Sequence, residues 1–332
     1  MHDYQVPPDD VTGIDTETAP WRTEYDVLST IRDKLGHDVK VLGVKDDLGV
    51  IRQANDEFKP HIAFNLLEAF HEVGTFDQNV VSYLELLRLS YTGCNPRGMF
   101  LARDKALSKK LMHYHRLPVP EFTVVPRGRK PKLPKRLSYP VIVKPLTQES
   151  SIGISQASVV PDEARFRERV QFIHESIRTD AIIEQFIDGQ ELYVGVLGNQ
   201  RLQVFPVWEM TFANMPEGQH RIATERVKWN VKYQAKIGIA TGEAKSLQPE
   251  VADRVRHVAS RTYRVLEQSG YSRIDLRLDS TGRVYVIEAN PNPQIARTED
   301  FAASAGAAGT DYPTLLQRIL TTGIRWEPER LG

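Results

Sequence analysis

The sequence has little of several features that would define a protein class at once. One cysteine, Cys94, stands among 332 residues, which excludes an internal disulfide and a cysteine-based zinc site and is typical of a reducing cytoplasm. No run of about 18 apolar residues is long enough to cross a bilayer. Residues 1–10 carry charges and two prolines where a signal peptide needs an apolar core. We therefore expect a cytoplasmic protein.

The sequence also lacks an excess of charge and the common nucleotide-binding loops. The 43 Lys and Arg residues balance the 43 Asp and Glu residues, so no net field attracts nucleic acid or an anionic membrane. Neither Gly-x-x-x-x-Gly-Lys-Ser/Thr nor Gly-x-Gly-x-x-Gly occurs, which excludes a P-loop and a Rossmann nucleotide site. Any site for a nucleotide must therefore be assembled from dispersed residues.

A chain of this length predicts two or three domains. In residues 1–97, helical spacing around Val27 and Ile31 is followed by apolar strand patterns at 39–44 and 62–66, which predicts an α/β domain with an open parallel sheet. Such a sheet usually begins with an apolar strand, and we expect this first strand to be missing upstream of Met1. Changes of pattern predict further domains at 98–188 and 189–332.

The strongest local pattern is a β-hairpin that carries acids. Residues 272–279 and 284–290 alternate, with turn residues between them. A loop of two or four residues would pair Asp275 with Glu288 and Arg273 with Asn290, whereas an odd loop would break this pairing. Opposed carboxylates repel each other unless a cation lies between them, and oxygen ligands suit Mg²⁺. In the alternative interpretation the hairpin faces solvent and Arg273 and Arg277 neutralise the acids.

Other charged residues suit the binding of phosphates. Lys144 ends an apolar strand pattern, and Lys105 lies near the start of a predicted helix; each alone is more typical of a surface lysine. Residues 148–154 are small and polar, so their backbone N–H groups suit phosphate oxygens. Glu184 and Glu191 flank the end of another strand, where both are equally typical of exposed charges.

Taken in order, these motifs resemble the ATP-grasp superfamily, and most closely D-alanine-D-alanine ligase, over roughly residues 85–322. The resemblance implies an α/β (α+β ATP-grasp) fold of three domains, in which the central and C-terminal domains clamp ATP. It implies an ATP-dependent ligase that forms C–N bonds through an acyl phosphate. We expect a homodimer that acts on small-molecule or peptide substrates.

The resemblance also implies the phosphate-binding residues. Lys105 and Lys144 would contact the ATP phosphates. A loop containing Ser150, Ser151 and Gly153 would close over them.

For the rest of the nucleotide, the resemblance implies three contacts between the domains. Glu184 would accept a hydrogen bond from the adenine amino group, the backbone of Ile187 would pair with the ring edge, and Glu191 would bind the ribose hydroxyls. Residues 224–236 resemble a lid that ends at Lys236 and shields the intermediate from water.

The catalytic centre is implied in the same way. Asp275, Glu288 and Asn290 would bind two magnesium ions. Arg273 would face the transferring phosphoryl group and the oxyanion, and with Lys144 would offset their charge.

The sequence departs from the family pattern where substrates would bind. The N-terminal Gly-Gly-x-Ser-x-Glu segment is absent, and other differences lie at residues 65–71, 148–149, 231, 237, 292–294 and 299–300. Glu68 lies in the first of these segments and is a candidate substrate contact. Glu299 and Asp300 replace a Ser-Leu pair that receives the acceptor's carboxylate, so we expect an amine, amide or neutral group there, unless Arg297 neutralises an acid. In the alternative, both acids cap a helix.

Three functions are compatible with these patterns. The first is a ligase for another amino acid or small peptide. The second is an enzyme that adds residues to a peptide or protein tail. The third is a nucleotide-binding regulatory module without catalysis, which the presence of Arg273, Asp275, Glu288 and Asn290 disfavours.

Overall fold

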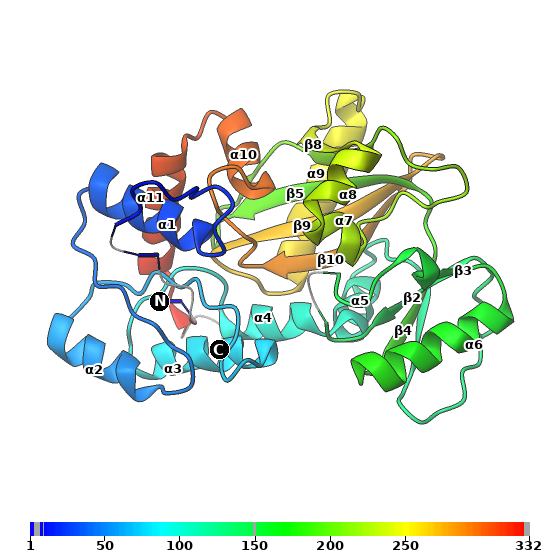
Figure 1. Cartoon of the computed structure of the whole chain (residues 1–332), viewed down its shortest axis with the longest axis horizontal. Helices are drawn as coiled ribbons and strands as arrows, with labels where there is room; N and C mark the ends of the chain where they lie inside the picture. The colour runs from blue at the N-terminus through cyan, green and yellow to red at the C-terminus, as the bar shows by residue number, and fades with distance from the viewer. Residues whose placement is uncertain (3–6, 9, 149–150, 329–332) are drawn as a thin grey trace.

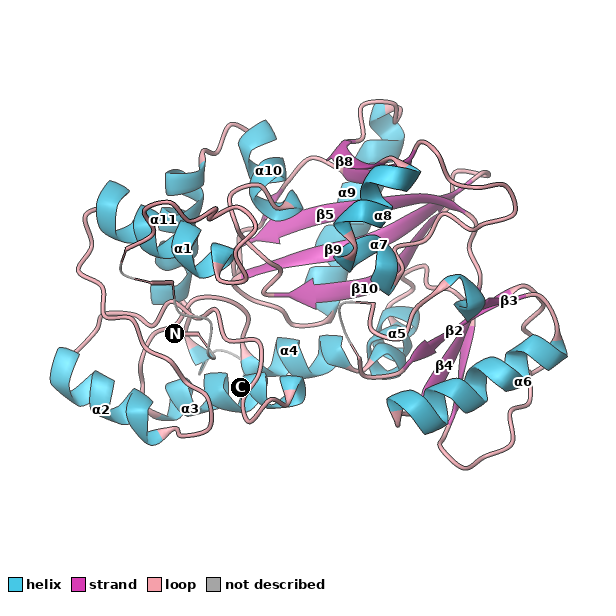
Figure 2. Cartoon of the chain, in the orientation of Figure 1, coloured by secondary structure: helices cyan, strands magenta, loops and turns pink. Residues whose placement is uncertain are grey.

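The computed structural model describes residues 1–2, 7–8, 10–148 and 151–328, which form two antiparallel sheets and a helical N-terminal region (Figures 1 and 2). The helices are α1 Arg22–Ser29, α2 Gly49–Phe58, α3 Asp77–Leu86, α4 Pro96–Arg103, α5 Lys105–Tyr114, α6 Glu163–Phe172, α7 Glu225–Trp229, α8 Val231–Ile237, α9 Pro249–Val265, α10 Asp300–Ala307 and α11 Tyr312–Ile324. The strands are β1 Phe122–Val125, β2 Val141–Pro145, β3 Val159–Val160, β4 Ala181–Gln185, β5 Gly189–Leu197, β6 Gln203–Val204, β7 Trp208–Phe212, β8 Ile239–Glu243, β9 Tyr271–Asp279 and β10 Val284–Pro291. The predicted α/β fold class is confirmed.

In the N-terminal region helices alternate with extended segments, as expected. The described extended segments, however, pair only through isolated bridges and not as regular strands. Helix α1 continues as a π-helical turn, Thr30–Lys34, in place of one uniform helix. The predicted strands at 39–44 and 62–66 appear as two parallel bridges, His2 with Gly43 and Ala63 with Tyr91. The domain limits near 97 and 188 stay a prediction.

The smaller sheet has the strand order β1-β4-β2-β3, and its neighbouring strands are antiparallel. Helix α6 packs on it through Phe166 and Val170, which join the apolar side chains of β2 and β4 in one core. Every residue of β2 is buried. This burial explains why Lys144, at the end of β2, projects into the protein and not into solvent.

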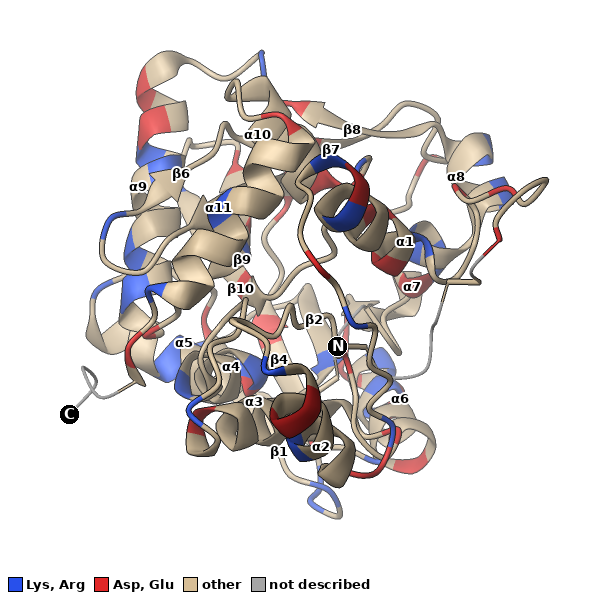
Figure 3. Cartoon of the chain, turned by 90° about the vertical axis from the view of Figure 1, so that its left-hand side faces the viewer, with Lys and Arg blue, Asp and Glu red and all other residues tan. Residues whose placement is uncertain are grey.

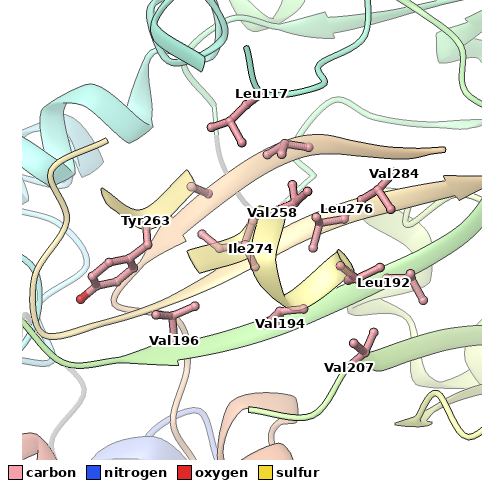
Figure 4. Packing of buried hydrophobic residues seen from close by; sticks show 14 of the residues in the cluster. Leu117, Leu192, Val194, Val196, Val207, Val258, Tyr263, Ile274, Leu276 and Val284 are labelled. Atoms are coloured by element: carbon pink, nitrogen blue, oxygen red, sulfur yellow. The ribbon is translucent and has the colours of Figure 1, made fainter. Parts of the chain in front are cut away.

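The larger sheet runs β10-β9-β5-β7-β8, and one of its faces is covered by α9 (Figure 4). Leu192, Val194 and Val196 of β5 point to this apolar face beside Ile274 and Leu276 of β9. Because side chains alternate along a strand, the intervening residues of β9 and β5 point to the opposite face. That face holds the charged side chains described below.

The β9–β10 hairpin has the expected residue pairing, but with a three-residue turn and a β-bulge. Its turn holds three residues, since the Asp279 N–H donates to the Arg283 carbonyl at 3.0 Å, and Gly282 takes a φ of +79°. The expectation that an odd loop breaks the pairing is wrong, because a β-bulge between Val286 and Glu288 shifts the register by one residue. Glu288 therefore lies opposite Asp275, and Asn290 opposite Arg273.

Acidic and basic residues are interspersed over the helices seen in Figure 3, in agreement with the balanced composition. None of the helices in the described part of the chain is both long and apolar enough to cross a membrane.

Candidate functional site

The face of the larger sheet opposite its apolar core holds charged side chains of β5 and β9. In Figure 1, α7 and α8 lie in front of this sheet. Arg273 and Asp275 of β9 form a two-pronged ion pair, with N–O distances of 2.8 and 3.0 Å. The Arg273 guanidinium also lies over the Tyr193 ring, 4.8 Å from its centroid. Asp275 is only 8% exposed, so the solvent-facing interpretation of the hairpin is wrong, although Arg273 does pair with this acid.

Lys105 connects the hairpin to the smaller sheet. Its ammonium lies 3.5 Å from a Glu288 carboxylate oxygen and donates to the Gln148 carbonyl at 2.6 Å. Asp104 is the N-cap of α5, so the helix begins at Lys105 itself. Lys105 and Lys144 are 5% and 6% exposed, so neither is a surface lysine.

A buried cluster of one acid and two lysines lies behind Lys105. The Glu184 carboxylate is 2.9 Å from the Lys144 ammonium and 3.1 Å from the Lys109 ammonium. Lys109 also donates to the Ile287 carbonyl at 2.5 Å, within the β-bulge. Sequence reasoning missed Lys109, although it follows Lys105 by four residues and so shares its helix face.

Glu191 and Ile187 are both engaged by Arg277 of β9. The Arg277 guanidinium lies 2.9 Å from the Glu191 carboxylate and donates to the Ile187 carbonyl at 2.8 Å. The Tyr193 hydroxyl also donates to Glu191, at 2.9 Å. Arg277 therefore orients the Glu191 carboxylate and the Ile187 carbonyl, which the resemblance implies as nucleotide contacts. This goes beyond the neutralisation of the hairpin acids that was considered for Arg277.

The loop after β2 contacts the segment that resembles a lid. The Ser151 hydroxyl donates to the Ala223 carbonyl at 2.8 Å, and the Gly153 N–H donates to the Glu225 carboxylate at 2.9 Å. The Glu225 N–H donates in turn to the Ile154 carbonyl at 3.0 Å. The loop and α7 thus hold each other over the site. Ser150 lies outside the described residues.

Two of the three lysines of the lid, Lys228 and Lys236, differ in position. Lys236 is exposed in the last turn of α8, and within the described residues no hydrogen bond or ion pair connects it to Asp275 or Glu288. Lys228 of α7 is half-buried, and its charge opposes the effect of burial on the pKa of both Asp275 and Glu288. The structure therefore brings Lys228, which sequence reasoning did not single out, toward the acids.

The paired acids respond differently to their surroundings. Burial raises the pKa of Asp275, and the neighbouring Glu288 charge adds to this, while Arg273 opposes it. Burial also opposes ionisation of Glu288, but Lys105, Lys228 and two further lysines outweigh it and lower the pKa of Glu288 to about 2. The lysines likewise outweigh burial at Glu184 and lower its pKa.

The candidate substrate residues lie at the other end of the sheet. Glu299 takes the N-cap position of α10 without a side-chain capping bond, and Asp300 begins the helix. Arg22 of α1 lies 3.9 Å from Glu299. Burial opposes the charge of Arg273, but Asp275 and, more weakly, Asp300 raise the pKa of this arginine. Both acids therefore lie at a helix start, as in the capping alternative, and the charge of Asp300 also acts on Arg273.

Arg297 does not neutralise Glu299 or Asp300, which was the role considered for it. Its backbone N–H donates to Asp26 at 2.8 Å, and its guanidinium donates to the Thr30 hydroxyl at 3.1 Å. Arg22 is the cation beside Glu299 instead. Glu68 is exposed. Burial raises the pKa of Tyr271 at the start of β9, and the charge of Glu68 adds to this rise.

A metal ion at this site would rest on few protein ligands. The described residues contain no group of three or more His, Cys, Asp and Glu side chains arranged to hold a metal. Asp275, Glu288 and Asn290 supply two carboxylates and an amide on adjacent strands. This small oxygen set fits Mg²⁺, which keeps waters and shares phosphate oxygens with its substrate.

Comparisons with known proteins identify similar sequences and a similar fold. Residues 111–321 match the family model described as D-ala D-ala ligase C-terminus. A D-alanine-D-alanine ligase from Desulfotalea psychrophila is 31% identical, over 93% of this chain and 92% of its own length. An uncharacterised Sinorhizobium fredii protein, y4sG, is also 31% identical, over 80% of this chain and 75% of its own. A Bacillus anthracis D-alanine-D-alanine ligase solved with ATP superposes with a TM-score of 0.72 at 22% identity, over 91% and 92% of the two chains.

Proposed function

Because the chain belongs to the D-alanine-D-alanine ligase family and is therefore an ATP-dependent carboxylate-amine ligase, we propose that it uses magnesium and an acyl phosphate. The product would be an amino acid or small peptide joined to an amine, with release of ADP and phosphate. The observation that carries the proposal is the pairing of Asp275 with Glu288 beside Lys105. Facing carboxylates next to buried cations are arranged for a metal-bound phosphate chain.

The buried cations are proposed to hold the nucleotide. Lys105 and Lys144 would contact the phosphates, beneath the loop through Ser151 and Gly153. Glu184 would accept from the adenine amino group while Lys109 keeps its carboxylate ionised, which the Lys109–Glu184 distance of 3.1 Å supports. Glu191 and the Ile187 backbone are proposed for the ribose and the adenine edge, positioned by Arg277.

The hairpin is proposed to hold two magnesium ions through Asp275, Glu288 and Asn290. Magnesium bound there would polarise the phosphoryl oxygens and offset their negative charge. The carboxylate of the donor would attack the γ-phosphate, and the amine of the acceptor would then displace phosphate. Arg273 uses two of its five N–H groups on Asp275, which leaves others for the charge that develops during transfer.

The lid is proposed to protect the acyl phosphate from water, with Lys228 as a cation facing the site. Replacing Glu225 by Ala removes the Gly153 N–H bond that joins lid and loop. We expect phosphate release without acceptor to rise by up to about tenfold relative to release with acceptor, because one charged hydrogen bond is worth about 1.4 kcal/mol here. Phosphate assays with and without amine measure this ratio. Glu217→Ala, at an exposed acid just before the lid, is the matched control, and an equal ratio in both variants would exclude a closing role for Glu225.

The acceptor pocket is proposed to disfavour a free carboxylate. The double variant Glu299→Ser/Asp300→Leu removes two acids, one of which acts electrostatically on Arg273. We expect acceptors with a free carboxylate to gain at least about tenfold in kcat/KM, because like charges at a poorly solvated site repel by a few kcal/mol. Competition assays with an amino acid and its amide measure the preference.

A matched control separates the two interpretations of these acids. Glu250→Ser alters an acid in the first turn of α9, away from the site. If the double variant keeps the original acceptor preference and changes only stability, as this control does, the acids serve the helix and the pocket proposal is wrong.

The overall proposal is tested by measuring ADP release with a panel of amino acids and dipeptides in the presence of Mg²⁺ and ATP. We expect ADP to form only when a specific carboxylate donor is present. Binding of ATP without donor-dependent turnover anywhere in the panel would favour the regulatory module. The homodimeric assembly and the cytoplasmic location both stay predictions. Sedimentation would test the assembly.

A further inference from the structure

A buried arginine without an acidic partner lies on the helix that covers the smaller sheet. Arg169 of α6 is only 8% exposed, and its Nε has no hydrogen-bond partner. Burial lowers the pKa of Arg169, and among the described residues no carboxylate forms an ion pair with it. A buried cation that lacks an acid lowers the stability of a fold. The place of Arg169 therefore needs a reason other than stability.

The Arg169 guanidinium holds residues 151–158, which we call the anchored segment. Its Nη2 atom donates to the Gly153 carbonyl and, at 2.8 Å, to the Ser158 hydroxyl. The same hydroxyl oxygen accepts a hydrogen bond from the Ser155 N–H at 3.0 Å. One side chain of α6 thus connects two consecutive turns of the anchored segment to the smaller sheet.

Gly153 lies in a β-turn that Arg169 holds from the outside. The Ile154 N–H donates to the Ser151 carbonyl at 2.9 Å, and Gly153, the third residue of this turn, takes a φ of +72°. The N–H and C=O groups of one trans peptide unit point in opposite directions. Because the Ile154 N–H points into the turn, the Gly153 carbonyl points out of it, toward Arg169.

Another side of the anchored segment is bonded to residues 220–225, at the start of the lid. The Gly153 N–H donates to the Glu225 carboxylate at 2.9 Å. Gln156 and His220 exchange two hydrogen bonds, each of 2.9 Å. These bonds would be lost if the lid moved away, whereas the bonds from Arg169 lie within the smaller sheet and its helix and would remain.

We propose that Arg169 is a positioning residue for ATP, which holds the anchored segment in place before the nucleotide and the lid contact it. The inference rests on the proposed function, in which Ser151 and Gly153 lie over the phosphates. A segment that is already ordered loses less conformational freedom on binding, so the affinity for the ligand rises without a direct contact. The lowered stability that follows from burying the Arg169 charge is offset by this gain in nucleotide affinity.

Arg169→Met separates a positioning role from a structural one. The variant keeps an apolar stem but loses the charge and both hydrogen bonds. We expect the KM for ATP in donor-dependent ADP release to rise about tenfold, as for one lost charged hydrogen bond. The kcat should fall by less than about threefold, because the segment binds ground state and transition state alike. The Tm should rise or stay within about 2 °C of the unaltered chain, because a buried charge is removed.

Two further variants serve as rescue and control. Arg169→Lys keeps the positive charge and a donor for the Gly153 carbonyl, so its KM for ATP should lie closer to that of the unaltered chain than to that of Arg169→Met. Arg167→Met alters an exposed arginine of the same helix, which pairs with Glu163, and should leave the KM for ATP unchanged.

Hydrogen exchange of the nucleotide-free chain tests the anchor without any activity. The amides of Ile154 and Ser155 should exchange at least about tenfold faster in Arg169→Met than in Arg167→Met. Equal exchange in the two variants, an unchanged KM for ATP, or a fall in Tm of more than about 5 °C in Arg169→Met would overturn the proposal. If the unaltered chain does not turn over ATP, the proposed function fails, while the exchange rates still decide whether Arg169 holds the segment.

Discussion

Replacing Asp275 by Asn is expected to lower the rate of ADP formation by about a thousandfold while the protein stays folded. The substitution keeps the size of the side chain but removes one of two charges from the facing pair. Loss of a metal ligand that helps offset phosphoryl charge costs several kcal/mol of transition-state stabilisation. Burial already raises the pKa of Asp275 and so favours its neutral form. A neutral Asn side chain should therefore be tolerated at this position.

The measurement is donor-dependent ADP release at saturating ATP, with Mg²⁺ varied from micromolar to millimolar. Asp253→Asn, at an exposed acid in α9, is the matched control and should behave as the unaltered protein. Tm values of both variants separate loss of chemistry from loss of folding. Normal turnover of Asp275→Asn at any magnesium concentration would remove this residue from the metal site.

Replacing Lys109 by Met is expected to lower the free energy of unfolding by about 3 kcal/mol and to weaken ATP binding. Lys109 is fully buried and shares the Glu184 carboxylate with Lys144. Removing one partner of a buried ion pair leaves charge without compensation, which typically costs several kcal/mol. The Ile287 carbonyl of the β-bulge loses its donor at the same time.

Urea unfolding measures the stability, and nucleotide titration measures the affinity. Lys110→Met, at the neighbouring exposed position, is the matched control. Adding Glu184→Gln to Lys109→Met should recover part of the lost stability, because no ionised acid then remains buried beside the gap. If Lys109→Met and Lys110→Met unfold at the same urea concentration, the buried cluster of Lys109, Lys144 and Glu184 does not stabilise the fold around the site.

Much of the fold and of the candidate site follows from patterns that are local in sequence. Alternation in residues 272–290 predicts the hairpin and its facing acids, because strand pairing needs only neighbouring residues. The β-bulge at Ile287 was not predictable, since its carbonyl is used by Lys109, about 180 residues away along the chain. The three-residue turn and the β-bulge each shift the register by one residue in opposite directions, so Asp275 still faces Glu288.

Residues that act through distant contacts were the ones missed. Lys109 looks like any helix lysine until the smaller sheet brings Glu184 to it. Lys228 and Lys236 lie in the same lid, and only the packing of α7 against the loop after β2 distinguishes them. The substrate pockets depend on how the N-terminal region contacts α10, which no local pattern specifies.

The transfer of oxygen from the donor to phosphate tests the central claim most directly. The protein would be given ATP, Mg²⁺ and a mixture of amino acids and dipeptides whose carboxylates carry ¹⁸O at both oxygens. If a carboxylate attacks the γ-phosphate, each phosphate released with product carries one ¹⁸O atom and the ADP carries none. Phosphate without ¹⁸O, or ¹⁸O in AMP, would contradict an acyl phosphate route at this site.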